Sequence, residues 1–315
     1  MKLTMRPYKS EEDYWQMRQF LREVLLLNSL HQHSWHVARL DYWWWFIQQD
    51  LEKMELEKSI FFWETEKKEI AAVLNPEGKG QAYLQVHPKF RTTELEEEMI
   101  QTAEKYFRHP NREGKLRSLI FADSKDSFRH NILKKHGYQK VERPETSEII
   151  HMFPLENEIH QVPTPEGYTI RALGHGLEML ERCYASGLGF HEDDIQTARE
   201  NRDDPTWYHH IQSAPLYRRD LDIVAIASDG SIASFCTVWF DDVTRTAYFE
   251  PVATVPKHQR HGLGKAVLTE GLKRLKMMGA KLATVGGYSN AANGLYFSVF
   301  GEEHDITQPW EKFFD

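Results

Sequence analysis

Residues 246–267, "TAYFEPVATVPKHQRHGLGKAV", give the clearest structural signal in this sequence, because a β-type run changes there into a helix-type run. The apolar stretch up to Val255 predicts a strand, and the segment at 262–278 predicts a helix. Three basic residues and two histidines surround the turn Gly262-Leu263-Gly264 between them. The first amides of a helix have no intrahelical partner and the helix dipole is positive there, so this turn predicts an anion site suited to pyrophosphate.

Two other kinds of phosphate loop fit these residues poorly. A P-loop places Ser or Thr after its Gly-Lys pair, because the hydroxyl holds magnesium, but Ala266 follows Lys265 here. A dinucleotide-binding loop requires a third glycine where Val267 stands and an acid about twenty residues later. An ATP or dinucleotide binder is therefore disfavoured.

The pattern Gln-x-x-Gly-x-Gly at 259–264, placed after a strand that ends in Val-Pro, resembles the acyl-CoA loop of the GNAT family of N-acetyltransferases. The stretch "SNAANGLYFSVFG" at 289–301 resembles the second signature of the family. One departure is that Gly301 follows Tyr296 by five residues, where the family usually has four. The resemblance covers the order of elements at 165–300. It implies an α/β fold in which a mixed, mainly antiparallel, twisted sheet is flanked by helices.

The resemblance also implies which residues carry the chemistry. Glu250 would accept the proton of an attacking amine, directly or through water, and Tyr296 would protonate the departing thiolate. From the residues alone, Glu250 is also a candidate structural carboxylate, and Tyr296 a candidate core tyrosine. Acetyl-CoA would be the acyl donor. Its contacts would come from the strand end, the loop and the next two helices: Val252, Ala253, Thr254, Val255, Gln259, Arg260, His261, Gly262, Leu263, Gly264, Lys265, Asn290 and Asn293.

Family resemblance further implies that the strand splays at Val252–Val255, so that free backbone amides bind the thioester carbonyl and the pantetheine arm. Pro251 and Pro256 suit such an interruption, because proline donates no ladder hydrogen bond. Asn290 has a second interpretation, as the cap of its own helix.

The stretch "PLENEIHQVPTPEGY" at 154–168 is the most linker-like part of the chain, and the same order of elements is predicted on either side of it. We therefore expect two tandem copies of one α/β unit. The first domain would occupy residues 1–155, the linker 156–165 and the second domain 166–315. The predicted helices lie at 10–28, 34–53, 93–108 and 126–136 in the first copy, and at 175–187, 191–201, 262–278 and from about 290 in the second.

The first copy lacks the glycine loop. Its segment "YLQVHPKFRTTELEEEM" at 83–99 follows the same strand-proline path, but Thr92, Thr93, Glu94 and Leu95 occupy the positions of the loop. Side chains there block the close approach of an anion, and acids at a helix start already satisfy the dipole. We predict that the first domain is degenerate and does not bind CoA, and that the second is catalytic.

Composition narrows the class of partner. The 315 residues carry a formal charge of −8, which argues against broad nucleic-acid binding and would attract amine-bearing molecules. No stretch approaches the roughly 18 apolar residues that span a bilayer, and the start lacks the core of a secretory signal. We expect a cytoplasmic protein that uses no membrane, as a monomer or a homodimer. Cys183 and Cys236 lie far apart and suit reduced, buried positions.

Two aromatic segments have no role in these motifs. In "DYWWWFIQQDL" at 41–51, helical spacing predicts a buried stripe that leaves other rings for an interdomain contact or an acceptor pocket. The segment "TWYHHIQSAPLYRRD" at 206–220 either shapes acceptor choice or is a connecting loop. The expected stripe is Leu40, Trp44, Ile47 and Leu51, and the remaining rings are Trp43, Trp45 and Phe46.

The clustered histidines at 31, 33, 36, 209 and 210 lack cysteines or acids at ligand spacing, so we expect surface or acceptor-wall residues and no metal.

Two functions stay open. In the first, the second domain transfers an acetyl group from acetyl-CoA to a primary amine of a small molecule or peptide, by direct attack in a ternary complex. In the second, the protein is a CoA-binding sensor or a structural tandem protein without catalysis. The acceptor itself is not predicted, because polyamines, aminoglycosides, amino acids, peptide termini and amino sugars all fit.

Overall fold

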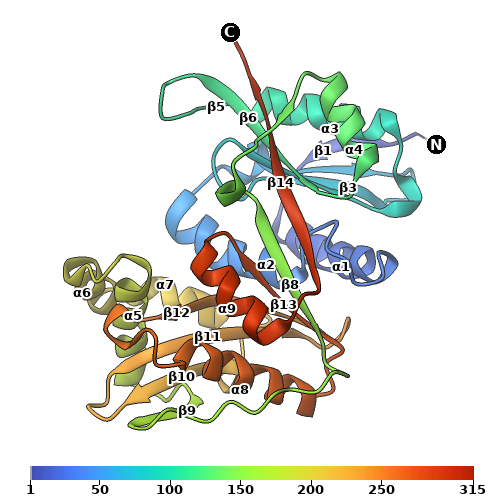
Figure 1. The fold of residues 1–315 in the computed structure, drawn as a ribbon. Helices are drawn as coiled ribbons and strands as arrows, with labels where there is room; N and C mark the ends of the chain where they lie inside the picture. The colour runs from blue at the N-terminus through green and yellow to red at the C-terminus, as the bar shows by residue number, and fades with distance from the viewer. Residues whose placement is uncertain (1) are drawn as a thin grey trace. The chain divides into compact units, whose positions relative to one another are not determined.

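A computed structural model describes residues 2–315, whose course is drawn in Figure 1. They fold into two compact units. Unit 1 contains the chain up to Trp43, then Ile47–Ile149 and Asp305–Asp315. Unit 2 contains Trp44–Phe46 and Ile150–His304.

Unit 1 is a sheet whose strands follow the order β1, β2, β3, β4, β6, β14. Neighbouring strands are antiparallel except β4 and β6, which are parallel. The core packs the apolar residues of these strands against α3, with Trp63 and Met99 fully buried. The strands are β1 (Thr4–Pro7), β2 (Phe61–Glu64), β3 (Ile70–Asn75), β4 (Gln81–Val86), β6 (Leu116–Asp123) and β14 (His304–Phe313), with short β5 (His109–Pro110) and β7 (Gln139–Lys140). The helices are α1 (Glu11–Leu27), α2 (Val37–Tyr42), α3 (Thr93–Tyr106) and α4 (Ser127–Lys135).

Unit 2 repeats this arrangement in the order β8, β13, β12, β11, β10, β9. Here β12 and β13 are parallel, and β9 to β12 are antiparallel. The strands are β8 (Glu148–Pro154), β9 (Tyr168–Ala172), β10 (Asp222–Ala227), β11 (Ile232–Asp241), β12 (Thr246–Thr254) and β13 (Leu282–Gly287). The helices are α5 (Leu177–Phe190), α6 (Ile195–Asp203), α7 (Thr206–Ser213), α8 (Leu263–Met277) and α9 (Asn290–Phe300).

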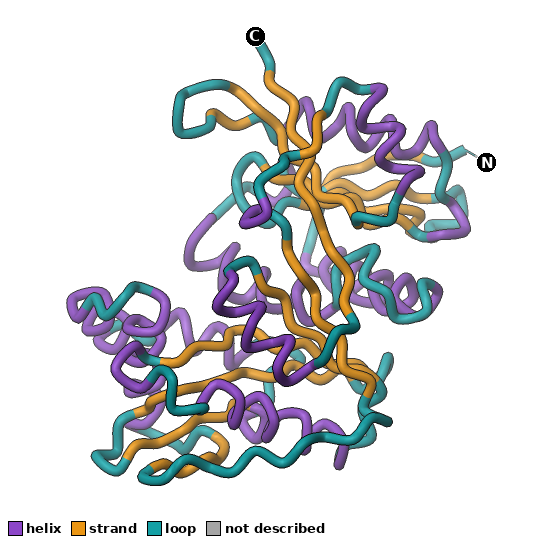
Figure 2. Tube along the Cα trace, viewed as in Figure 1, coloured by secondary structure: helices purple, strands orange, loops and turns teal. Residues whose placement is uncertain are grey.

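Helices cover both faces of the sheet in unit 2, as the purple and orange segments of Figure 2 show. A Cβ on Gly189 of α5 would lie 3.9 Å from the Phe235 ring, and one on Gly271 of α8 would lie 3.1 Å from Val238. Phe235 and Val238 are three residues apart on β11, so they point to opposite faces. The sheet of unit 2 is thus enclosed between α5 and α8, which agrees with the expected α/β class.

The two halves of the sequence exchange their last strands. β8 ends the first half in sequence, yet the chain from Ile150 onward belongs to unit 2. β14 ends the second half, yet it pairs antiparallel with β6 of unit 1, from Thr307↔Asp123 to Phe313↔Arg117 (Figure 1). The compact units therefore differ from the divisions 1–155 and 166–315. Both strands have the same place in the repeat, so their order along the chain does not say which sheet each one completes.

The segment predicted as one helix at 34–53 is corrected by the structure. After α2, residues Trp43–Glu52 form a π-helix, whose turn is wider than that of an α-helix. The stripe expected from α-helical spacing is therefore wrong: Trp43 is fully buried, and Leu51 is 62% exposed. Trp44–Phe46 belong to unit 2, where the Phe46 ring lies 5.3 Å from that of Trp207.

Trp207 lies on α7, a helix that the sequence analysis did not predict within 206–220.

Within residues 2–315, no helix combines the length and the apolar character needed to cross a membrane. The same part of the chain holds no group of three or more His, Cys, Asp or Glu side chains that could bind a metal ion.

Candidate active site

The candidate site begins where β12 and β13 part. The two strands are paired only from Thr246↔Leu282 to Phe249↔Val285, whereas β12 continues to Thr254. On its other edge β12 stays paired with β11, with a bulge that contains Glu250 and Pro251. The divergence thus begins directly after Phe249, earlier than the expected range Val252–Val255.

Backbone amides at this open edge alternate in direction. The Val255 N–H donates to the Ala233 carbonyl at 2.9 Å, so it faces β11. Because N–H groups alternate along an antiparallel strand, the amide of Ala253 also faces β11, and those of Val252 and Thr254 face the side that β13 has left. Within the expected range Val252–Val255, the amides of Val252 and Thr254 are therefore the ones directed to bind a carbonyl there.

The glycine turn leaves the start of α8 uncovered. Gly262 is the N-cap, has φ of 81° and forms no side-chain cap hydrogen bond. A Cβ at this position would meet no heavy atom within 4 Å. The first hydrogen bond of the helix runs from Ala266 N–H to Gly262 C=O at 3.0 Å, so the amides of Leu263, Gly264 and Lys265 precede it. This geometry fits an anion such as a pyrophosphate.

The side chains of Gln259 and His261 make contacts within the protein. Gln259 donates its Nε2–H to the Thr254 carbonyl at 3.2 Å, which ties the loop to the end of β12. The Tyr168 hydroxyl lies 3.3 Å from Nδ1 of His261. Arg260 is exposed, with a positive φ of 65°, and Lys265 is half-buried. The cationic groups at the mouth of the site are therefore Arg260 and Lys265.

Glu250 and Tyr296 interact electrostatically across the site. Glu250 is half-buried in the bulge of β12, and its backbone carbonyl accepts a hydrogen bond from Trp239 Nε1. Tyr296 is 6% exposed on α9. Burial raises the pKa of its hydroxyl, and the nearby charge of Glu250 raises it further. Tyr296 thus keeps its proton at neutral pH and is chemically able to act as a general acid.

For the two asparagines of the second signature, the structure contradicts the helix-cap interpretation of Asn290, and contact with the cofactor stays a prediction. Ser289, not Asn290, caps α9, since its Oγ accepts from the Ala292 N–H at 3.1 Å. Asn290 is exposed in the first turn. Asn293 is buried, and its Oδ1 lies 3.0 Å from Nε2 of His151. Asn293 therefore faces the interior of unit 2, because the i, i+3 spacing with Tyr296 turns it toward β8.

His151 is a residue that the sequence analysis missed. Its segment, "EIIHMFP", has the pattern of an apolar strand, and a single histidine within such a strand is no signal by itself.

The other histidines expected at the surface are mostly held by the protein. His31 pairs with Asp305 at 3.1 Å, and His33 lies 3.5 Å from Asp123. His36 is buried, and its Nδ1 caps α2 by accepting from the Ala38 N–H. The expectation of surface or acceptor-wall positions is thus wrong for His36, because its ring satisfies a helix start.

Both cysteines are free and buried, as expected. Burial raises the pKa of the Cys183 thiol to about 12, so it is protonated at neutral pH.

In unit 1 the start of α3 is closed by its own side chains. Thr92 Oγ1 accepts from the Leu95 N–H at 3.2 Å. Glu96 is fully buried, and its carboxylate forms ion pairs with Nε of Arg91 at 2.6 Å and Nε of Arg129 at 2.9 Å. Burial alone would raise the pKa of Glu96, but the charges of Arg129 and Arg91 lower it. The position equivalent to the loop is therefore occupied by an internal ion-pair network.

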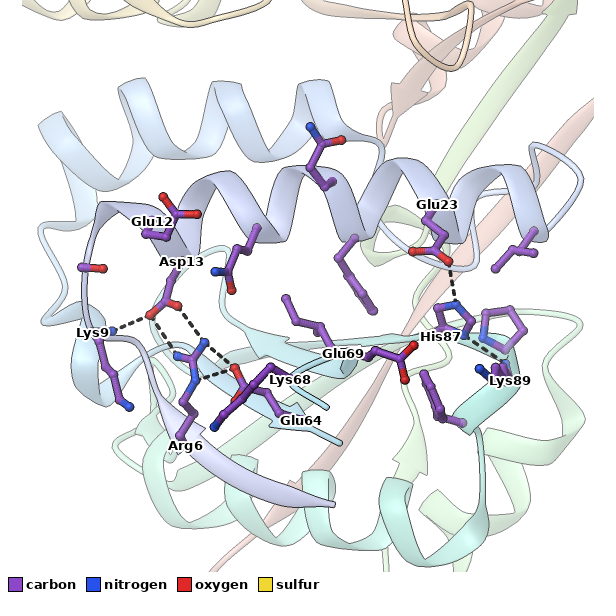
Figure 3. A pocket seen from close by; sticks show the side chains of 18 residues that line it. Arg6, Lys9, Glu12, Asp13, Glu23, Glu64, Lys68, Glu69, His87 and Lys89 are labelled. Carbon is purple, nitrogen blue, oxygen red and sulfur yellow. Dashed lines mark hydrogen bonds and ion pairs between the residues drawn. The ribbon is translucent and has the colours of Figure 1, made fainter. Parts of the chain in front are cut away.

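Two cavities lie near these helix starts. In unit 2, a cavity of about 420 Å³ lies between residues 159–163 and the helices α8 and α9, with Lys265 and Thr269 in its wall. In unit 1, a cavity of about 850 Å³ lies along α1 and beside His87–Phe90 (Figure 3). Charges in the larger one are mostly paired with each other, for example Arg6 with Asp13. The smaller cavity is the one beside the candidate anion site.

Known proteins share this architecture. Residues 187–301 match the model of the acetyltransferase (GNAT) family. No curated protein matches the chain. The GCN5-related N-acetyltransferase from Sphaerobacter thermophilus superposes with a TM-score of 0.65 at 16% identity, over 99% of this chain and 95% of that one. A tandem GNAT protein from the clavulanic acid biosynthesis pathway superposes with a TM-score of 0.63 at 12% identity, over 99% of this chain and 98% of that one. A GNAT-family acetyltransferase from Colwellia psychrerythraea superposes with a TM-score of 0.59 at 12% identity, over 98% of this chain and 100% of that one. At these identities the solved structures establish the fold.

Proposed function

We propose that unit 2 is an acetyl-CoA-dependent N-acetyltransferase. The match of residues 187–301 to the GNAT family model and the likeness of the fold to a tandem GNAT protein support an acyltransferase. Its acceptor would be a primary amine of a small molecule or a peptide. The reaction would proceed by direct attack in a ternary complex.

Binding of acetyl-CoA would use the chain's own amides. The amides of Leu263, Gly264 and Lys265 precede the first hydrogen bond of α8, so they are suited to a pyrophosphate. The amides of Val252 and Thr254 would hold the thioester carbonyl and the pantetheine arm. Donors fixed in the backbone need no reorganisation when the oxyanion develops.

The transfer itself balances with two side chains. Glu250 takes a proton from the acceptor ammonium, directly or through water, which frees the nitrogen lone pair. The nitrogen attacks the thioester carbon, and an N–C bond forms as the carbonyl becomes an oxyanion. Collapse of this intermediate breaks the C–S bond, and Tyr296 gives its proton to the departing thiolate. The nitrogen, positively charged after the attack, loses its second proton to water, which leaves a neutral amide. Tyr296 regains its proton from water, and Glu250 releases to water the proton that it took.

One observation carries the proposal above the others. The turn before α8 is open at Gly262, while the equivalent turn before α3 is capped by Thr92 and filled by the Glu96 network. This difference between the two helix starts supports an anion site before α8 and none before α3.

Binding is tested first, by thermal unfolding with acetyl-CoA, ATP and NAD. A ligand at 100 times its dissociation constant adds about 2.7 kcal/mol to the free energy of unfolding. We expect stabilisation by acetyl-CoA alone. Stabilisation by ATP or NAD without acetyl-CoA would contradict the proposal.

Catalysis is tested second, by release of free thiol from acetyl-CoA with a panel of amines. Polyamines, aminoglycosides, amino acids, peptides and amino sugars form the panel. Binding of acetyl-CoA with no thiol release in any member would support a CoA-binding protein without catalysis.

A further inference from the structure

His151 lies on β8, the strand that comes from the first half of the sequence and belongs to unit 2. Backbone hydrogen bonds of two residues that follow the histidine hold this segment in place. The Met152 N–H donates to the Glu303 carbonyl at 2.9 Å, and the Leu155 N–H donates to the Lys281 carbonyl at 2.8 Å. β8 is therefore fixed beside the segments that enter β13 and leave α9.

The His151 side chain is fully buried against one face of α9. Its Nε2 lies 3.0 Å from Oδ1 of Asn293. Its ring centroid lies 4.4 Å from that of Phe297 and 5.5 Å from that of Tyr296, both at edge-to-face angles. Residues 293, 296 and 297 are three and four apart and share one side of the helix. His151 thus contacts the side of α9 that carries Tyr296.

The hydrogen bond fixes the protonation of the ring. The amide oxygen of Asn293 only accepts, so Nε2 of His151 carries the hydrogen and Nδ1 carries the lone pair. Within residues 2–315, Nδ1 is buried without a hydrogen-bond partner. Burial lowers the pKa of His151. The hydrogen bond to Asn293 raises this pKa, and the nearby His304 lowers it further. A buried polar atom left unpaired is costly, so packing alone is a poor reason for a histidine here.

Gly287 on β13 closes the other side of Asn293. A Cβ at Gly287 would lie 2.3 Å from Oδ1 of Asn293 and 3.1 Å from Cδ2 of Tyr296. The bare backbone of β13 is therefore in contact with both residues. Asn293 is held between Gly287 and His151, which fixes the rotation of α9 about its axis.

We propose that His151 is a positioning residue that sets the direction of the Tyr296 hydroxyl by holding Asn293 and the adjoining face of α9. This inference rests on the proposed function, because it takes Tyr296 as the general acid. Its consequence is that the degenerate first half supplies, through β8, a working part of the active unit.

The test compares steady-state thiol release by the full-length protein and its variants. His151→Leu removes the donor and keeps an apolar side chain, so kcat should fall roughly tenfold to a hundredfold, as expected when a reacting group is misplaced by about 1 Å. KM for acetyl-CoA should stay within about twofold, because the start of α8 is untouched. His151→Gln keeps an N–H for Asn293 and should restore most of kcat. Asn293→Ala removes the same bond from the other side and should reproduce the loss, also where His151→Leu does not fold.

A double variant separates positioning from general stability. If His151 acts through Tyr296, then His151→Leu has no further effect on kcat once Tyr296→Phe has removed the hydroxyl. Met152→Leu is the matched control, because it changes the neighbouring buried residue on the opposite face of β8 and should keep wild-type kcat.

Two results would overturn the proposal by itself. One is wild-type kcat in both His151→Leu and Asn293→Ala. The other is a double variant in which the loss of kcat from His151→Leu adds in full to the loss from Tyr296→Phe. A wild-type protein that binds acetyl-CoA and releases no thiol with any amine would instead remove the proposed function, and this inference with it.

Discussion

The two glycines of the loop have different physical reasons to be glycine. Gly262 has φ of 81°, a conformation that costs glycine little, and a side chain there would project into open space. Gly264 lies inside the first turn of α8, and its Cβ would lie 2.9 Å from Leu295 of α9. Gly264 therefore permits close packing of two helices, whereas Gly262 keeps the anion position clear.

Gly262→Glu should remove acetyl-CoA binding. The new carboxylate would stand where the pyrophosphate is expected, and charge-assisted hydrogen bonds of about 1.5–3 kcal/mol each would be lost. We expect the affinity, measured by calorimetry, to fall on the order of a hundredfold or more. Gly230→Glu is the matched control, since Gly230 has φ of 85° and equally open space in the β10–β11 turn. Equal loss of binding in both variants would show that strain, not position, is the cause.

Glu250→Gln and Tyr296→Phe should slow turnover while acetyl-CoA still binds. Each variant removes one proton-transfer group, and such groups contribute about 10²–10⁴-fold to rate. We expect kcat to fall by roughly a hundredfold or more in each, with acetyl-CoA affinity nearly intact. Unchanged kcat in both variants would leave only a binding role for the site.

The raised pKa of Tyr296 gives a prediction for the pH profile. Burial first, and then the charge of Glu250, favour the protonated hydroxyl. The general acid therefore stays competent as pH rises, up to at least the ordinary tyrosine value of about 10. We expect the kcat of the wild-type protein to show no decrease between pH 7 and 9 that is due to Tyr296. A basic limb in that range that the Phe variant lacks would mean that Tyr296 titrates much lower.

Sequence patterns located the site better than they oriented its side chains. The glycine loop and the tyrosine helix were both expected where α8 and α9 now lie. Asn293 was expected to contact the cofactor, but it faces His151, because a motif gives the spacing of residues and not the rotation of the helix. Val255 was expected to offer a free amide, but its N–H bonds Ala233, and strand pairing cannot be deduced from one strand.

Helices α3 and α8 occupy the same place in the repeat and start in opposite ways. The start of α3 has a threonine cap and a buried glutamate between two arginines, and the start of α8 has neither. Acids already placed at a helix start satisfy its dipole, so an anion gains little there. The start of α3 thus holds internal ion pairs, and the start of α8 does not, which is the basis of our prediction that unit 1 does not bind CoA.

Glu96→Gln should destabilise unit 1 without affecting acetyl-CoA binding. The variant leaves Arg129, which is 4% exposed, without its main charge partner, and breaking such a buried pair costs about 3–5 kcal/mol. Chemical denaturation measures the loss. Glu97→Gln is the control, because Glu97 forms its ion pair with the exposed Lys135 and should matter little. Loss of acetyl-CoA binding in a folded Glu96→Gln variant would indicate that unit 1, and not unit 2, binds the cofactor.

The same glutamate predicts an effect of acid. Since folding lowers the pKa of Glu96, the stabilisation is present above the unfolded value and is lost as pH falls through the folded value. We expect the stability gap between wild type and Glu96→Gln to close in acid. A gap that stays constant as pH falls would contradict the ion-pair explanation.

Periodicity predicted most helices and strands but not the irregular ones. The helices at 10–28, 93–108 and 262–278 are present as α1, α3 and α8, because their apolar residues recur at α-helical spacing. The π-helix at Trp43–Glu52 escaped prediction, since three adjacent tryptophans satisfy any helical period. α7 escaped because it has only 8 residues, with polar and aromatic residues mixed.

The exchange of β8 and β14 gives each unit a part from the other half of the sequence. Unit 2 takes its strand beside β13 from the first half, and unit 1 takes its strand beside β6 from the second half. A duplicated sequence predicts two domains, but identical places in the repeat hide which copy of a strand fills which sheet. The first half of the sequence thus supplies β8 to the sheet of unit 2.

Cutting the chain in the linker tests this dependence for the whole protein. Pro163 and Thr164 are exposed, so a break between them should disturb little packing. We expect the pieces 1–163 and 164–315 to copurify when they are expressed together, because each carries a strand that the other unit needs. Only the reassembled pair should show an acetyl-CoA-dependent rise in melting temperature, and each piece expressed alone serves as its control. If 164–315 alone bound acetyl-CoA as tightly as the intact chain, β8 would be dispensable, and the retention of the first half would need another physical reason.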